Sequence, residues 1–81
     1  MKFEMFSRVA LATDIPESRL KRGDVARIVD YFAPKPDRVA GYILEVFNAL
    51  GESIDVVSVP ETSIESLQED EILTIRHMQV A

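Results

Sequence analysis

Apolar and polar residues alternate with a period of two along much of this chain, which is the pattern of β-strands with one buried face. Several of these runs are also rich in β-branched and aromatic residues, which favour strands. The pattern predicts five strands, at residues 7–13, 25–32, 41–48, 53–59 and 72–78.

A polar connection over residues 14–24 separates the first two predicted strands. Pro16 fixes its own φ and pushes Ile15 towards an extended conformation. We expect Ile15 and Leu20 to anchor this connection inward, and Gly23 to take a positive φ just before the second strand.

The other connections are shorter. Two prolines predict that residues 33–40 form a surface loop, because proline cannot donate to a ladder. Residues 48–52 are expected to form a hairpin turn with Gly51 in the left-handed conformation. Residues 61–67 are expected to form one helical or 3-10 turn, followed by a charged turn at 69–71.

Five short strands with one helical or 3-10 turn before the last strand predict an all-β protein. The expected architecture is a small SH3-like five-stranded barrel, and an OB-like barrel is the alternative. The 81 residues are expected to form a single domain, 1–81, with Phe3 and Phe6 as lids on one barrel end.

The order and spacing of several short segments over residues 5–76 resemble the small bacterial proteins known as domain of unknown function 4926. The resemblance implies an SH3-like fold and a stand-alone bacterial protein, encoded beside other small proteins in the manner of antitoxin or immunity partners. It brings no catalytic residues. The segments are Val9-Ala10-Leu11, Asp14-Ile15-Pro16-Glu17, Leu20, Gly23, Ile28-Val29, Gly41-Tyr42-Ile43-Leu44-Glu45-Val46-Phe47, Leu50-Gly51 and Val57-Ser58-Val59-Pro60.

The small size of the chain favours self-association. A domain of this length buries only about 60% of its unfolded surface, so its core is thin. The chain has no cysteine, so no disulfide or thiolate-metal site can supplement that core. No stretch is long and apolar enough for a signal peptide or a membrane span, and the expected location is the cytoplasm.

The net charge of −5 is unevenly placed. Residues 1–40 carry eight Lys and Arg against six Asp and Glu, or +2, whereas residues 41–81 carry one against eight, or −7. Phosphate contacts dominate nucleic-acid affinity, so this balance argues against a general nucleic-acid binder. A local basic patch remains an alternative, formed by Arg19, Lys21, Arg22, Lys35 and Arg38.

The sequence contains no convincing catalytic or metal-binding constellation. The single histidine, His77, lies on a predicted strand and would need an unusual carboxylate set to bind zinc. A catalytic triad could be selected from Ser63, His77 and Asp55, but any chain with many hydroxyl and carboxylate residues allows such a selection. The three glycines are isolated, so phosphate-binding loops are absent. We therefore expect no enzyme activity, no cofactor and no metal.

Both faces of the third and fourth predicted strands carry large apolar residues, so one face stays apolar whichever face points inward. Such a patch, of roughly 300 to 400 Å², is near the size that marks an interaction site. Tyr42, Leu44, Val46, Ile54 and Val56 are assigned to the core side, and the candidate interface on the other side consists of Ile43, Phe47, Val57 and Val59.

These observations predict a non-catalytic protein-interaction module that forms a homodimer. An antitoxin- or immunity-like partner of a neighbouring protein is one specific form of this function. A nucleic-acid or ribosome-associated SH3-like barrel and an accessory domain of a metalloenzyme are the alternatives.

Overall fold

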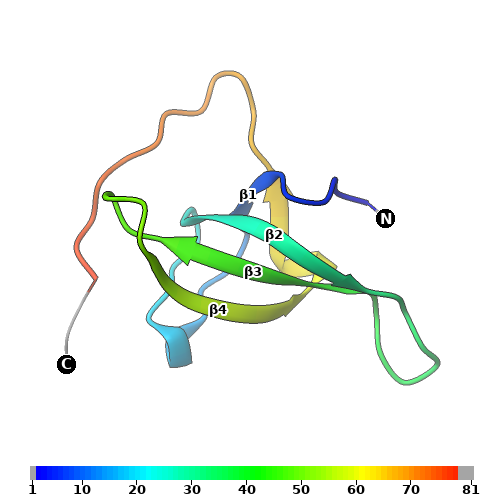
Figure 1. Ribbon diagram of the computed structural model, residues 1–81. Helices are drawn as coiled ribbons and strands as arrows, with labels where there is room; N and C mark the ends of the chain where they lie inside the picture. The colour runs from blue at the N-terminus through cyan, green and yellow to red at the C-terminus, as the bar shows by residue number, and fades with distance from the viewer. Residues whose placement is uncertain (1, 79–81) are drawn as a thin grey trace.

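The computed structural model describes residues 2–78, in which five strands form one antiparallel sheet in the order β4-β3-β2-β1-β5 (Figure 1). The prediction of an all-β protein with five strands is confirmed. Within the described residues no ladder joins the two edge strands, β4 and β5. The strands are β1 (Arg8–Leu11), β2 (Val25–Phe32), β3 (Gly41–Phe47), β4 (Ser53–Pro60) and β5 (Ile64–Ser66), and the two 3-10 turns are η1 (Pro16–Ser18) and η2 (Glu61–Ser63).

The prediction of a last strand over residues 72–78 is wrong. The 3-10 turn expected within residues 61–67 ends at Ser63, and the backbone of Ile64 is already extended, with a φ of −131°. Ile64 to Ser66 therefore pair with β1 directly after the turn. Because β5 takes the free edge of β1, residues 72–78 have no strand to pair with there.

The core lies on one face of the sheet, around Tyr42 of β3. Tyr42 is fully buried, and its hydroxyl accepts hydrogen bonds from the backbone N–H groups of Lys2 and Phe3, each at 3.1 Å. The Phe3 ring packs edge-on against Tyr42, with a centroid distance of 5.5 Å. Phe3 thus covers the core as expected, whereas Phe6 is largely exposed to solvent.

The connection between β1 and β2 has the anchors that the sequence indicates. Leu20 is buried in the core, and Ile15 packs against the core from a half-buried position. The backbone N–H of Ile15 donates to the carbonyl of Leu20 at 2.8 Å. Gly23 has a φ of +93° and Gly51, in the β3–β4 turn, a φ of +81°, so both predicted left-handed turn positions are confirmed.

A β-bulge in β2 changes which side chains of this strand reach the core. Ile28 pairs with Leu44 of β3, but the next pair is Asp30 with Ile43, so Val29 is the extra residue. The bulge reverses the alternation, and Tyr31 therefore lies on the core side with Tyr42 at a ring distance of 5.2 Å. Strict alternation along residues 25–32 predicts Tyr31 on the opposite face from Ile28, and the bulge makes this prediction wrong.

Candidate interaction surface

The register of β3 and β4 decides which apolar side chains face the core. Directly opposed residues in an antiparallel pair lie on the same face. Tyr42 is opposite Val59 and Leu44 is opposite Val57, so these valines face inward with β3's buried residues. Val59 is only 4% exposed, and Val57 packs partly against the core.

The predicted face assignment is therefore corrected for β4. Val57 and Val59 do not share a face with Ile43 and Phe47, the other two candidate interface residues. Whether an interface forms at this face stays a prediction.

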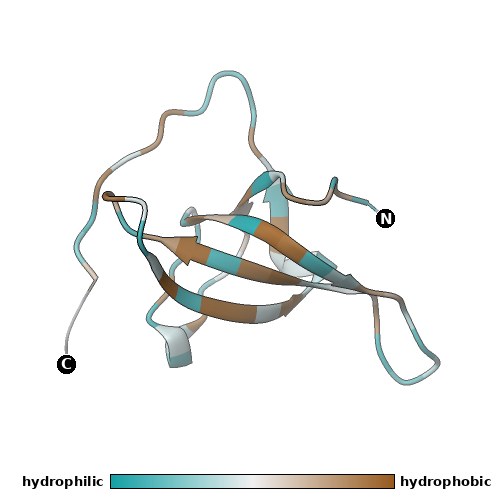
Figure 2. Cartoon of the chain, in the orientation of Figure 1, coloured by the Kyte–Doolittle hydropathy of each residue, from teal (hydrophilic) through white to brown (hydrophobic). Residues whose placement is uncertain are grey.

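The outer face of β3 and β4 carries a different apolar set. Ile43 is half-buried, and Phe47 is 38% exposed at the end of β3. On β4, Val56 lies opposite Glu45 and is 57% exposed. Ile54 is the extra residue at a bulge beside Phe47 and is 45% exposed. We call Ile43, Phe47, Ile54 and Val56 the outer apolar face, and Figure 2 shows apolar residues along both strands.

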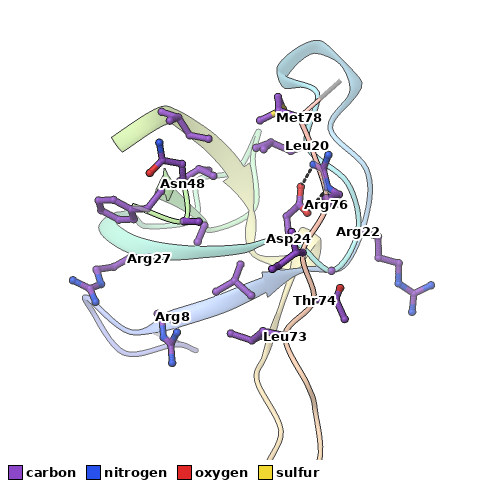
Figure 3. A pocket seen from close by; sticks show the side chains of 18 residues that line it. Arg8, Leu20, Arg22, Asp24, Arg27, Asn48, Leu73, Thr74, Arg76 and Met78 are labelled. Atoms are coloured by element: carbon purple, nitrogen blue, oxygen red, sulfur yellow. Dashed lines mark hydrogen bonds and ion pairs between the residues drawn. The ribbon is translucent and has the colours of Figure 1, made fainter. Parts of the chain in front are cut away.

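An open groove of about 720 Å³ adjoins this face. The β3–β4 turn lies on one side of the groove and the segment 73–78 on the other (Figure 3). Its apolar lining includes Leu20, Val46, Phe47 and Ile54. Phe47 and Ile54 therefore belong both to the outer apolar face and to the groove.

Two of the arginines that line the groove lie directly opposite each other in the sheet. Arg8 of β1 is the register partner of Arg27 of β2, and both are exposed. Within residues 2–78 neither forms an ion pair, although Glu45 of β3 is the register neighbour of Arg27 on its other side. Like charges directly opposite in a sheet are destabilising, so this pair is an electrostatic cost to the fold.

One ion pair holds the C-terminal segment beside the sheet. The Arg76 guanidinium donates to the Asp24 carboxylate from Nε, at 2.8 Å to Oδ1, and from Nη2 to Oδ2 (Figure 3). Nη2 also donates to the carbonyl of Arg19 at 3.1 Å. Asp24 also accepts a hydrogen bond from the Lys21 N–H at 2.8 Å. We call this contact between Arg76 and Asp24 the clamp. Leu73 and Met78, which lie on either side of Arg76 in the chain, also line the groove.

The clamp lowers the pKa of Asp24 and raises the pKa of Arg76, as expected for two opposite charges in contact. Partial burial by itself raises the pKa of Asp24, but the hydrogen bonds from Arg76 and Lys21 and their positive charges together outweigh it, so the pKa lies below its ordinary value. The hydrogen bond to Asp24 raises the pKa of Arg76. The pair is therefore ionised throughout the neutral range.

The comparison with protein families gives one match. A family model described as Domain of unknown function (DUF4926) matches residues 5–66. The chain belongs to this family. No curated protein and no solved structure gives a significant match.

The match to DUF4926 ends at Ser66, which is also the last residue of β5. The matched range therefore contains all five strands of the sheet. The segment 67–78, with the acidic turn and Arg76, follows the matched range, so the ion pair joins Asp24 inside this range to Arg76 beyond it.

The triad and the metal site considered for this DUF4926 chain can be examined in its described part. Ser63, Asp55 and His77 form no side-chain hydrogen bonds with one another, and His77 is exposed. Among residues 2–78 no group of three His, Asp or Glu side chains is arranged to hold a metal ion. The same residues include no helix with the length and apolar character of a membrane span.

Sequence reasoning missed three features of this surface. The clamp joins residues 52 positions apart, and no local pattern marks such a pair. The opposition of Arg8 and Arg27 depends on the β1–β2 register. Ile54 and Val56 were visible as an alternating pair, but the wrong face was assigned to them.

Proposed function

We propose that this chain is a non-catalytic protein-interaction module that works through the outer apolar face. The exposure of Phe47, Ile54 and Val56 on two neighbouring strands is the observation that carries the proposal. Exposed apolar residues scattered singly need no explanation, whereas a contiguous patch on a soluble domain marks a contact surface. Burial of such side chains is worth roughly 1.5 to 3 kcal/mol each.

The proposal includes an SH3-like barrel as the framework. Two observations support it: β2 pairs with β1 through its first residues and with β3 through its later ones, and η2 directly precedes the last strand. Val59 of β4 and Ile64 of β5, from opposite edges of the sheet, belong to the same core cluster. Side-chain nuclear Overhauser effects between Val59 and Ile64 would test this curvature, and their absence would contradict it.

A second copy of the chain is the simplest partner. A twofold contact uses one surface twice, so each side chain of the outer apolar face is buried in both copies. The resemblance to stand-alone small proteins also supports a protein encoded nearby as the partner, in the manner of antitoxin or immunity proteins. Both partners use the same apolar chemistry, and we place the homodimer first.

The mass of the protein in solution tests the proposal. We expect light scattering at micromolar concentration to give twice the mass of one chain. Val56→Lys puts a charge on the outer apolar face and should give single chains that remain folded by circular dichroism. Thr13→Lys is the matched control, because Thr13 is exposed in the β1–β2 connection, and it should leave the dimer intact. A parent that scatters as a single chain would refute the homodimer.

A further inference from the structure

The outer apolar face alone is small for a stable dimer. Specific interfaces bury about 800 Å² on each partner, whereas a patch of this kind supplies roughly 300 to 400 Å². A stable pair of chains therefore needs a second contact region. The groove beside Phe47 and Ile54 is continuous with the face and is available for it.

The groove has a distinct chemistry. Its lining combines apolar side chains with Arg8 and Arg27, which have no ion-pair partner among residues 2–78. Of the other two lining arginines, Arg76 is bound to Asp24, and Arg22 lies on the opposite side of the groove from Arg8 and Arg27 in Figure 3. Such a site suits an acidic segment that also carries an apolar anchor.

The chain itself carries a segment with that chemistry. Glu69, Asp70 and Glu71 are followed directly by Ile72, which is 86% exposed. Figure 1 shows that the trace after β5 arcs away from the sheet before it descends beside the β3–β4 turn. Within the described residues these three acids form no ion pair, although the Glu71 carboxylate accepts a hydrogen bond from the Gln68 backbone N–H. Their negative charges are therefore not neutralised within the described part of the chain.

We propose that two copies form a reciprocal contact, which we call the exchange, in which the arch Glu69–Ile72 of each copy enters the groove of the other. The acidic run lies against Arg8 and Arg27 of the second copy and offsets their mutual repulsion. Ile72 contacts the apolar lining beside Phe47 and Ile54. The two ends of each arch stay on its own domain, because β5 pairs with β1 on one side and Arg76 binds Asp24 on the other. This inference rests on the proposed self-association and adds the second contact region.

Charge reversal in the full chain tests the exchange. Variant one carries Arg8→Glu and Arg27→Glu, and variant two carries Glu69→Lys, Asp70→Lys and Glu71→Lys. Each variant alone places like charges against each other in both contacts, so sedimentation velocity should show a dimer dissociation constant raised by about tenfold or more. A mixture of the two variants restores opposite charges in both contacts and should form a heterodimer at the parent's concentration. Formation of the heterodimer also shows that both variants are folded.

The outcomes separate this inference from the proposed function. If Val56→Lys dissociates the parent dimer while both charge-reversal variants remain dimeric, the exchange is overturned and the outer apolar face stands. If the charge reversals dissociate the dimer and the mixture does not restore it, the pairing of acidic run with arginines is overturned. If the parent binds a labelled mixed-sequence oligonucleotide through Arg8 and Arg27 while self-association is unchanged in the reversal variants, the groove is a nucleic-acid site and the exchange is overturned.

Discussion

Gly41 has no room for a side chain, and this gives a sharp test of the packing between β2, β3 and β4. Gly41 lies opposite Phe32 on one side and Pro60 on the other. A methyl group at this position would overlap the Phe32 ring and lie 2.7 Å from the backbone oxygen of Val59. The ring can move, but the carbonyl belongs to a paired strand and cannot move freely. Gly41→Ala should therefore destabilise the fold by about 1 to 3 kcal/mol through overpacking.

Urea denaturation measures this effect directly. With an m value of about 1 kcal/mol per molar urea for a small domain, the midpoint of Gly41→Ala should fall by about 1 to 3 M. In a Phe32→Leu background the ring atoms that meet the methyl group are gone, and the same substitution should cost clearly less but not zero, because the Val59 oxygen remains. An equal cost in both backgrounds, or an unchanged midpoint in the parent, would refute the packing argument. Gly23→Ala is the control, because a methyl group at Gly23 would meet no atom within 4 Å and its cost should not depend on Phe32.

Three further predictions concern the turn, the core and the clamp. Gly23→Val should lower stability by roughly 1 to 3 kcal/mol in urea denaturation, because a β-branched residue resists a φ of +93°. Tyr42→Phe should cost about 1 to 3 kcal/mol and speed hydrogen exchange at Lys2 and Phe3, because it leaves their N–H groups without the buried acceptor. The pKa of Asp24 is lowered by folding, so its ionised form stabilises the fold above about pH 4 and this contribution is lost as the pH falls through the folded-state value. The melting-temperature deficit of Asp24→Asn should be steady at neutral pH and shrink below about pH 4; a deficit that persists in acid would contradict the role of the clamp.

The strand content of this fold was predictable because it depends on local pattern. Alternation and turn residues gave the first four strands, the left-handed glycines and the inward anchor Leu20. The fifth strand was misplaced because residues 72–78 have the stronger strand composition, whereas three residues after η2 reach the free edge of β1 first. The pairing of β5 with β1 was therefore decided by closeness along the chain and not by β-strand propensity.

The surface was harder to predict because it depends on register. A bulge at Val29 shifts the alternation of β2 by one residue. The residues on either side of Val29 contain no sequence signal for this bulge. On β4, both alternating sets of residues are apolar. The sequence alone therefore does not show whether Ile54 and Val56 or Val57 and Val59 face the core. The ladder with β3 decided it, placing Val59 beside the buried Tyr42. Of the four predicted interface residues, Val57 and Val59 therefore face inward, whereas Ile54 and Val56, assigned to the core side by the sequence pattern, are exposed.

Intermolecular contacts at the outer apolar face are the most direct measure of the central claim. In a mixed sample of isotope-labelled and unlabelled chains, an isotope-filtered nuclear Overhauser experiment reports only contacts between copies. We predict that the methyl groups of Ile43, Ile54 and Val56 show such contacts, and that Val56→Lys abolishes them. Intermolecular contacts at other methyl groups alone, or none in a sample that sediments as a dimer, would contradict the account.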